Sequence, residues 1–224
     1  MSEVRRNKWF DWAFLAFGLV IQVVTYFITV IHTPGALSPL SLISGCLGVC
    51  SVCLTAQGNI LFFFFGFAQV VTYLYLCLKA HLYGEVAINV YYFVTLIYGI
   101  YAWRKRLQPE DSKHVRTRRL PWAVWLTIVC GILVVSAGVG WLLQTYTDDP
   151  TPYLDSFVSV TSIVAQILMI MVYRDQWLLW LTVDVLSIAM WLYVGDWCMT
   201  AQHAFWCANC IYGYYKWKGL EENL

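Results

Sequence analysis

Aromatic and polar side chains recur at helical spacing inside the long apolar segments of this chain. The clearest set is Trp177, Trp180, Asp184, Ser187 and Trp191, whose steps of three, four, three and four residues place all five on one face of a helix. Indole faces stack on a flat ring, and they attract a cation if that ring is charged. The set therefore indicates a site for a small aromatic ligand, although anchoring of the two leading tryptophans at a membrane surface is a rival explanation.

Other amide, hydroxyl and phenol side chains lie inside further apolar segments, where burial in lipid is costly and an interior position is favoured. Amides and hydroxyls suit sugar hydroxyls and a carboxamide. A phosphate would need Arg or Lys, and neither lies deep in an apolar segment. We therefore expect an uncharged or cationic compound of an aromatic ring and a sugar. The candidate binding residues are Trp177, Trp180, Asn89, Tyr92, Asp184, Gln166, Asn209, Asn59 and Gln69.

Three roles stay open for Asp184: a buried hydrogen-bond acceptor, a proton site or a ligand contact. Replacing Trp177 or Trp180 by alanine is expected to weaken ligand binding and to leave the fold intact. The eight cysteines lie in or at the edge of apolar segments, which favours helix packing over a disulfide framework. His203 and Cys207 have a spacing that a metal site could use, but further ligands are needed. We expect no metal, cofactor or nucleic-acid partner.

Long membrane-spanning helices must position these side chains. The chain is 60% hydrophobic and 12% charged, with a mean hydropathy of +0.63, whereas a soluble domain carries about 25% charged residues. The apolar runs are too long and continuous for a β-barrel. They predict an all-α membrane protein of about eight transmembrane helices. The runs are 10–31, 37–54, 59–79, 84–103, 121–143, 153–172, 177–194 and 198–217.

The basic residues indicate an orientation in the membrane. With eight spans, thirteen of the fourteen Lys and Arg residues fall on the side that holds both termini, seven of them in the segment 104–120. Since Lys and Arg concentrate in cytoplasmic loops, both termini are predicted to be cytoplasmic.

An internal repeat divides the chain. Ser38, Ser41 and Ser44 recur 118 residues later, and the motif Tyr98-Gly99-x-Tyr101-x-Trp103 recurs 114 residues later. Two parallel three-helix repeats joined by a linker helix are typical of a transport pathway between two halves. The 118-residue offset makes Asn59 and Gln69 of the first repeat equivalent to Trp177 and Ser187 of the second. The expected parts are 1–33, an N-terminal segment with a peripheral helix; 34–103, the first bundle; 104–120, a basic cytoplasmic loop; 121–145, the linker helix; 150–217, the second bundle; and 218–224, a cytoplasmic tail.

Three features resemble the PnuC family of bacterial vitamin transporters, whose architecture is similar to that of SWEET sugar transporters. They are the Trp177-Leu-Leu-Trp180 pair, the Asn89-Val-Tyr-Tyr92 segment and the paired Tyr-Gly-x-Tyr-x-Trp helix ends. The resemblance implies facilitated diffusion of nicotinamide riboside across the inner membrane, driven by phosphorylation of the substrate by a separate cytoplasmic nucleoside kinase. It implies ligand binding at Trp177, Trp180, Asn89 and Tyr92, and a homotrimer.

Alternatives remain open at the level of sequence. The short motifs do not separate nicotinamide riboside from other vitamins such as riboflavin or thiamine, and a lone Asp184 could carry a proton. An intramembrane enzyme would use Asp184 and His203 as an acid–base pair, which requires that the two side chains reach a common point. In a receptor or assembly subunit, the aromatic face would be a helix-packing seam.

Overall fold

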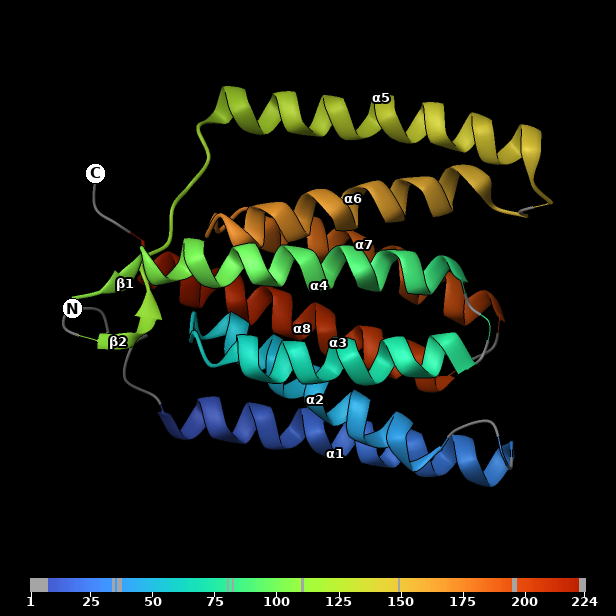
Figure 1. The fold of residues 1–224 in the computed structure, drawn as a ribbon, viewed down its shortest axis with the longest axis horizontal. Helices are drawn as coiled ribbons and strands as arrows, with labels where there is room; N and C mark the ends of the chain where they lie inside the picture. The colour runs from blue at the N-terminus through green and yellow to red at the C-terminus, as the bar shows by residue number, and fades with distance from the viewer. Residues whose placement is uncertain are drawn as a thin grey trace.

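The computed structural model describes residues 8–33, 35, 38–79, 81, 83–109, 111–148, 150–194 and 197–221. In these residues eight long helices lie roughly parallel, and a short hairpin lies at the end where α1 begins and α8 ends (Figure 1). The elements are α1 (Lys8–His32), α2 (Pro39–Ala56), α3 (Phe62–Lys79), α4 (Tyr83–Arg104), β1 (Leu107–Gln108), β2 (Asp111–Val115), α5 (Trp122–Tyr146), α6 (Pro152–Ile170), α7 (Gln176–Val194) and α8 (Trp197–Gly219).

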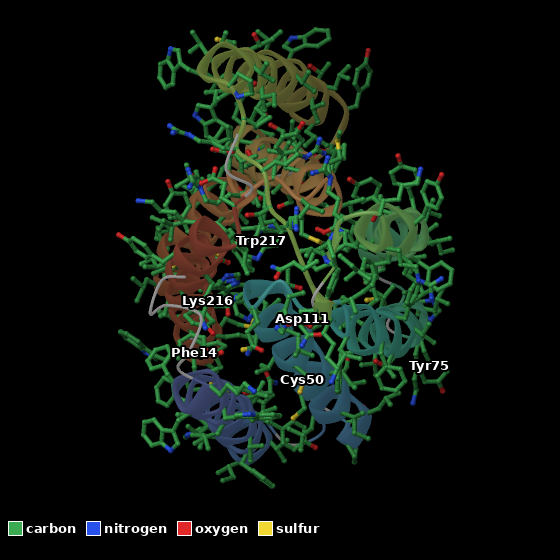
Figure 2. All side chains as sticks on the ribbon, turned by 90° about the vertical axis from the view of Figure 1, so that its left-hand side faces the viewer. Phe14, Cys50, Tyr75, Asp111, Lys216 and Trp217 are labelled. Carbon is green, nitrogen blue, oxygen red and sulfur yellow. The ribbon has the colours of Figure 1, made fainter. Side chains whose placement is uncertain are left out.

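Six of the helices close a ring. In the order α2, α3, α4, α6, α7 and α8, each helix contacts the next, and α8 returns to α2. Outside this ring, α1 packs on α2 and α8, and α5 packs on α6. The end-on view shows α5 and α1 at opposite edges, with Trp217 toward the middle of the ring and Tyr75 at its periphery (Figure 2). The ring therefore joins α2–α4 to α6–α8 at two seams, α4 with α6 and α8 with α2.

The helices have the length and apolar character of membrane spans. Seven are long and apolar enough to cross a bilayer, and α8 is the exception among the described helices. Helix α8 carries Gln202, His203 and Asn209 along its length and Lys216 and Lys218 in its last turn. Since α8 packs against α7, α2 and α1, its polar residues find protein partners, which lowers their cost in a membrane.

Helix α1 is fixed to the ring through a carboxylate. Tyr212 of α8 donates its hydroxyl to Asp11 at 2.5 Å, and the Lys216 ammonium lies 2.8 Å from the same carboxyl group. Phe14 stacks on Phe205 of α8, with ring centroids 5.2 Å apart. Lys216 and Phe14 can be followed in Figure 2.

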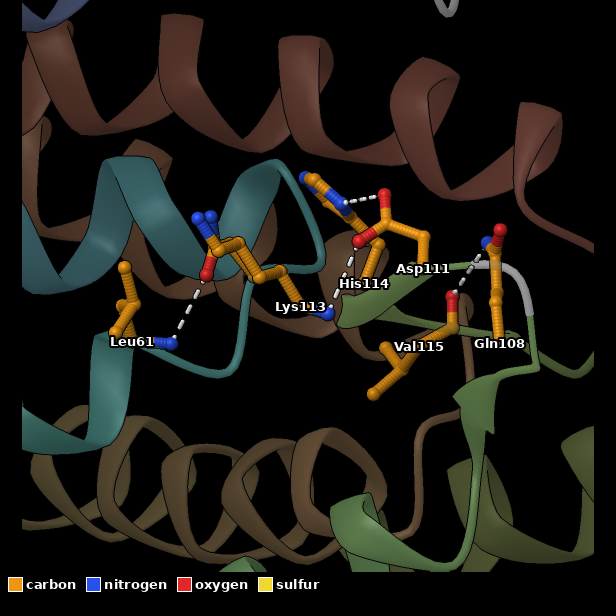
Figure 3. Close-up of polar contacts among 7 residues, drawn as sticks. Leu61, Gln108, Asp111, Lys113, His114 and Val115 are labelled. Atoms are coloured by element: carbon orange, nitrogen blue, oxygen red, sulfur yellow. Dashed lines mark hydrogen bonds and ion pairs between the residues drawn. The ribbon is translucent and has the colours of Figure 1, made fainter.

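A hairpin forms where the sequence predicted only a basic loop. β1 and β2 pair antiparallel, with Gln108 opposite Asp111. The Asp111 carboxylate accepts from the Lys113 backbone N–H at 3.0 Å and lies 2.6 Å from His114 Nδ1 (Figure 3). This aspartate therefore closes the turn with local contacts, a role that Asp commonly takes in turns. The all-α architecture holds, with this hairpin as its one addition in the described residues.

The connecting segment, residues 113–118, continues β2 across the end of the ring. The Val115 N–H donates to the carbonyl of Gly58 at 3.0 Å, and the Arg118 N–H donates to the carbonyl of Val172 at 2.9 Å. Between them, the Thr117 hydroxyl donates to the backbone carbonyl of Trp217 at 2.6 Å. Val115 and Thr117 are fully buried. The connecting segment is therefore bonded to the α2–α3 turn, to the α6–α7 turn and to α8.

These two turns have the same backbone structure. Gly58 has a φ of +68° and Val172 a φ of +63°, and the two lie 114 residues apart. This left-handed region suits glycine and is rare for a β-branched residue. In both turns the following N–H donates to the carbonyl five residues back, from Asn59 and from Tyr173, at 2.9 Å. The turns are thus equivalent at an offset of 114.

Two buried tryptophans make reciprocal hydrogen bonds at the same offset. Trp103 of α4 donates its indole N–H to the Met169 carbonyl of α6 at 3.2 Å, and Trp217 of α8 donates to the Thr55 carbonyl of α2 at 2.8 Å. Both partners in one bond lie 114 residues from their counterparts in the other. The two indoles also meet edge to face, with centroids 5.8 Å apart. Each seam is therefore fixed by the same contact.

The 118-residue register predicted for the first part of the repeat is wrong at these turns and seams. The predicted and observed registers differ by four residues, about one turn of helix. A shift of one turn leaves each residue on the same helix face, so the recurrence of serines such as Ser38 and Ser156 fitted a wrong offset. The choice of Asn59 and Gln69 depended on that register.

Replacing Gly213 by alanine is expected to lower the melting temperature of the detergent-purified protein. A Cβ atom there would lie 2.6 Å from two ring atoms of Trp177, so the indole must move, and overpacking of this kind costs about 1–3 kcal/mol. Gly131→Ala is the matched control, because a Cβ on this α5 glycine has no heavy atom within 4 Å. Equal melting temperatures for the two variants would contradict the packing of Trp177 on Gly213.

Candidate functional site

Most of the predicted binding residues are buried within the ring. Trp180, Tyr92 and Gln69 are half-buried, and the other six are buried. The three residues that must face the interior for a site to exist, Trp177, Asp184 and Asn209, are 4%, 5% and 2% exposed. The α7 and α8 faces predicted from spacing therefore point inward rather than toward lipid.

Asp184 is the centre of a polar cluster between α7 and α8. One carboxylate oxygen lies 3.1 Å from His203 Nδ1, and the other accepts from the Cys210 thiol at 3.5 Å. The Trp206 ring stands edge-on to the imidazole, with centroids 4.9 Å apart and an interplanar angle of 82°. A carboxylate buried away from water needs such partners. The cluster places one acidic group at a fixed position inside the ring.

Amide side chains cross both seams of the ring. Gln166 of α6 donates to the Thr95 hydroxyl of α4 at 3.3 Å, and Asn209 of α8 donates to the Val52 carbonyl of α2 at 3.4 Å. Gln166 lies 114 residues after Val52, and Asn209 lies 114 residues after Thr95. The amides therefore occupy equivalent seams, although the side chains that make the contacts differ. Sequence reasoning did not select Thr95, and the 114-residue offset from Asn209 is the signal that identifies it.

Trp177 lies near the connecting segment. Its indole packs on Gly213 and meets Trp217 edge to face, with centroids 5.7 Å apart and an interplanar angle of 88°. Its Nε1 is buried, and no described residue accepts from it. This burial changes the expectation for Trp177→Ala, because removing a core indole costs stability as well as any ligand contact. Trp180, one turn further along α7, packs between two apolar clusters and stays half-buried.

Asn59 and Gln69 lie in the contact between α2 and α3. Asn59 is in the turn itself, where its side-chain oxygen accepts from the Leu61 N–H at 3.0 Å (Figure 3). Gln69 lies on α3 against Gly48, whose ideal Cβ would be 3.5 Å from the Gln69 Cγ. The structure thus gives Asn59 a turn-forming contact.

Asn89 and Tyr92 lie on α4, three residues apart, so their side chains are neighbours on one face of the helix. Asn89 is buried, and Tyr92 is half-buried against the large apolar cluster that contains Trp103. The neighbouring Tyr91 donates its hydroxyl to the Ile163 carbonyl of α6 at 2.9 Å. The α4–α6 seam therefore includes Tyr91, which lies between the two candidate residues in the sequence.

Among the helices that the structure describes, the positions far from the helix ends include a buried carboxyl group and no Lys or Arg. Every Lys and Arg of the described helices lies in a terminal turn: Lys8, Lys79, Arg104, Lys216 and Lys218. Asp184, in contrast, lies eight residues inside α7. Among the described residues, no group of three His, Cys, Asp or Glu could hold a metal ion. The arrangement favours neutral or cationic ligands.

A ring of apolar helices around buried amides, indoles and one carboxylate is the architecture of a multi-pass membrane transporter. The model of a family described as nicotinamide mononucleotide transporter matches residues 38–219. The chain belongs to this family.

Curated relatives and a solved structure extend the comparison. The chain is 30% identical over 217 residues to the nicotinamide riboside transporter PnuC of Haemophilus influenzae, covering 95% of this chain and 91% of the relative. It is 30% identical over 222 residues to PnuC of Neisseria mucosa, covering 94% and 81%. The crystal structure of the vitamin B3 transporter PnuC superposes with a TM-score of 0.75 at 28% identity, covering 94% of this chain and 91% of that one. The relatives are transporters, so the intramembrane-enzyme alternative is set aside.

Proposed function

We propose that the chain carries nicotinamide riboside across the bacterial inner membrane by facilitated diffusion. The observation that supports this substrate is the buried Asp184 among amides and indoles, with every helical Lys and Arg confined to terminal turns. The ring of nicotinamide riboside is a flat pyridinium cation joined to a sugar. Indole faces and a carboxylate attract such a cation, and amides pair with its carboxamide and hydroxyls.

The same observation argues against the nucleotide. The phosphate of nicotinamide mononucleotide would bring negative charge into a buried region that already holds Asp184 and has no Lys or Arg partner in the middle of the described helices. An unpaired buried charge is costly. We therefore assign the nucleoside, although the family model is described by the nucleotide.

Net uptake then needs a cytoplasmic step that removes free substrate, and we propose phosphorylation by a separate nucleoside kinase. We propose that both termini and the basic 104–120 segment lie in the cytoplasm, because thirteen of the fourteen Lys and Arg residues fall on the side of the predicted topology that holds the termini. We also propose a homotrimer, as the family resemblance implies. Light scattering of the detergent-purified protein measures its oligomeric state, and a monomer would contradict the trimer.

Counterflow in proteoliposomes tests the substrate and the mechanism. Vesicles loaded with unlabelled nicotinamide riboside are expected to accumulate labelled riboside transiently without ATP or an ion gradient, and the label returns chemically unchanged. Excess nicotinamide mononucleotide, riboflavin and thiamine serve as competitors and are expected to leave the signal unchanged. Absence of exchange by folded protein would overturn the proposal. Competition by riboflavin or thiamine would show that the protein carries that vitamin, and the assignment of nicotinamide riboside would be withdrawn.

Trp180→Ala is expected to raise the Kd for nicotinamide riboside about fivefold, with some loss of thermal stability because the indole packs against two apolar clusters. The half-buried indole lies one helical turn before Asp184 on α7, and a stacked aromatic contributes about 1 kcal/mol. Titration calorimetry of the purified protein measures the change. Trp141→Ala on α5, where the indole is exposed, is the matched control. An unchanged Kd for Trp180→Ala would reduce this tryptophan to a packing residue.

A further inference from the structure

We propose that Trp206 and Asn209 of α8 together recognise the carboxamide of the ligand, and that His203 is the positioning residue that holds Trp206 and Asp184 in place. This inference rests on the proposed function, because it assigns residues to the nicotinamide group of that substrate. The Trp206 indole N–H donates to the carboxamide oxygen. The Asn209 side-chain oxygen accepts from the carboxamide NH₂ group.

The two halves of the ring point to this part of α8. The offset of 114 residues relates the turns at Gly58 and Val172 and the seam bonds of Trp103 and Trp217. The same offset carries Asn89 and Tyr92 onto His203 and Trp206. The residue types differ, so the correspondence rests on the 114-residue register and not on residue identity. The second half therefore presents its own polar–aromatic pair at the position of the first.

Two buried atoms on one face of α8 lack partners. Trp206 Nε1 has no acceptor and Asn209 Oδ1 has no donor among the described residues. A buried polar atom left unpaired costs about 1–3 kcal/mol, so each such atom calls for an explanation. The two residues are three positions apart, and side chains at this spacing are neighbours on a helix. One N–H donor and one C=O acceptor side by side match the two ends of a carboxamide.

Neighbouring contacts hold this pair in position. Asn209 donates its NH₂ to the Val52 carbonyl at 3.4 Å, which leaves its oxygen to face a ligand. The Trp206 ring lies against the His203 imidazole at 82°, and His203 is itself 3.1 Å from Asp184. His203 thus joins the carboxamide-reading pair to the carboxylate that faces the pyridinium charge. A fixed donor–acceptor pair gives specificity because an analogue without the group leaves both atoms unpaired.

Binding of nicotinamide riboside and of pyridine riboside, which lacks only the carboxamide, tests the proposal. Trp206→Phe removes the N–H and keeps an aromatic ring. It is expected to raise the Kd for nicotinamide riboside about three- to tenfold and to leave the Kd for pyridine riboside unchanged. Trp197→Phe makes the same change at an exposed position of α8 and is expected to alter neither Kd. An unchanged Kd for nicotinamide riboside, or an equal rise for both ligands, overturns the proposal.

The wild type supplies a readout that does not depend on any variant. It is expected to bind nicotinamide riboside at least tenfold more tightly than pyridine riboside, and equal affinities overturn the carboxamide assignment even if Trp206→Phe does not fold. His203→Leu is expected to lose the preference for nicotinamide riboside over pyridine riboside. His203→Gln, which still donates to Asp184, is expected to retain most of this preference. A purely structural histidine would change both affinities equally.

Wild-type counterflow of nicotinamide riboside in the same preparation distinguishes failure of this inference from failure of the proposed function. Exchange by the wild type together with an unchanged ligand preference in Trp206→Phe overturns this inference and leaves the proposed function standing. Failure of the wild type to exchange overturns both.

Discussion

Trp217→Ala is expected to destabilise the protein by about 3–5 kcal/mol, the largest effect of any single truncation considered. Trp217 is fully buried, donates to the Thr55 carbonyl at 2.8 Å, and meets the indoles of Trp103 and Trp177 edge to face. Its removal leaves a cavity at the seam and an unpaired carbonyl. Thermal unfolding in detergent measures the loss.

Two further variants separate the contribution of the hydrogen bond from that of the buried indole volume. Trp217→Phe keeps most of the volume and removes the N–H, so it is expected to cost about 1 kcal/mol, the contribution of one hydrogen bond. Trp122→Ala on α5 removes an exposed indole and is expected to change the melting temperature little. A Trp217→Ala protein as stable as Trp122→Ala would show that the seam contact does not hold the halves together.

Asp184→Asn is expected to weaken binding of nicotinamide riboside at least tenfold and to leave binding of the reduced, uncharged riboside within about twofold. Asparagine keeps the shape and a hydrogen-bond acceptor for His203, so the change removes mainly the charge. A contact to a charged group contributes about 1.5–3 kcal/mol, and 1.4 kcal/mol is a tenfold change in Kd. Titration with both ligands measures the ratio.

Asp11→Asn is the matched control for the charge. Asp11 is a carboxylate in a polar contact with Tyr212 and Lys216, between α1 and α8 and outside the ring. Its replacement is expected to leave the preference for the cationic ligand unchanged. If Asp184→Asn lowers the affinities for both ligands by the same factor, the carboxylate serves packing rather than recognition of the cation.

The helices were predictable from sequence because each one is a continuous apolar run. The runs 121–143 and 37–54 correspond to Trp122–Tyr146 and Pro39–Ala56. The inward face of α7 was also predictable, since Trp177 and Asp184 lie seven residues apart, two turns of a helix. These are local properties, and a helix period reports them directly.

Contacts between helices were not predictable in the same way. The pairing of Asp184 with His203 depends on the rotation of α7 against α8, which no single helix specifies. The register predicted for the first part of the repeat was wrong by one turn, because a helix face looks alike after four residues. The hairpin was missed because strands as short as Leu107–Gln108 carry no alternating apolar pattern.

The connecting segment sets a length limit on motion at its end of the protein. Arg118, bonded to Val172, lies three positions after Val115, bonded to Gly58, and three residue steps span about 10 Å when fully stretched. While both hydrogen bonds are formed, the length of this stretch limits how far apart the α2–α3 turn and the α6–α7 turn can move. A larger separation of the two halves at this end requires the connecting segment to break its hydrogen bond to one of the two turns. Such a movement therefore occurs in steps and releases one half before the other, even though the two turns have the same structure.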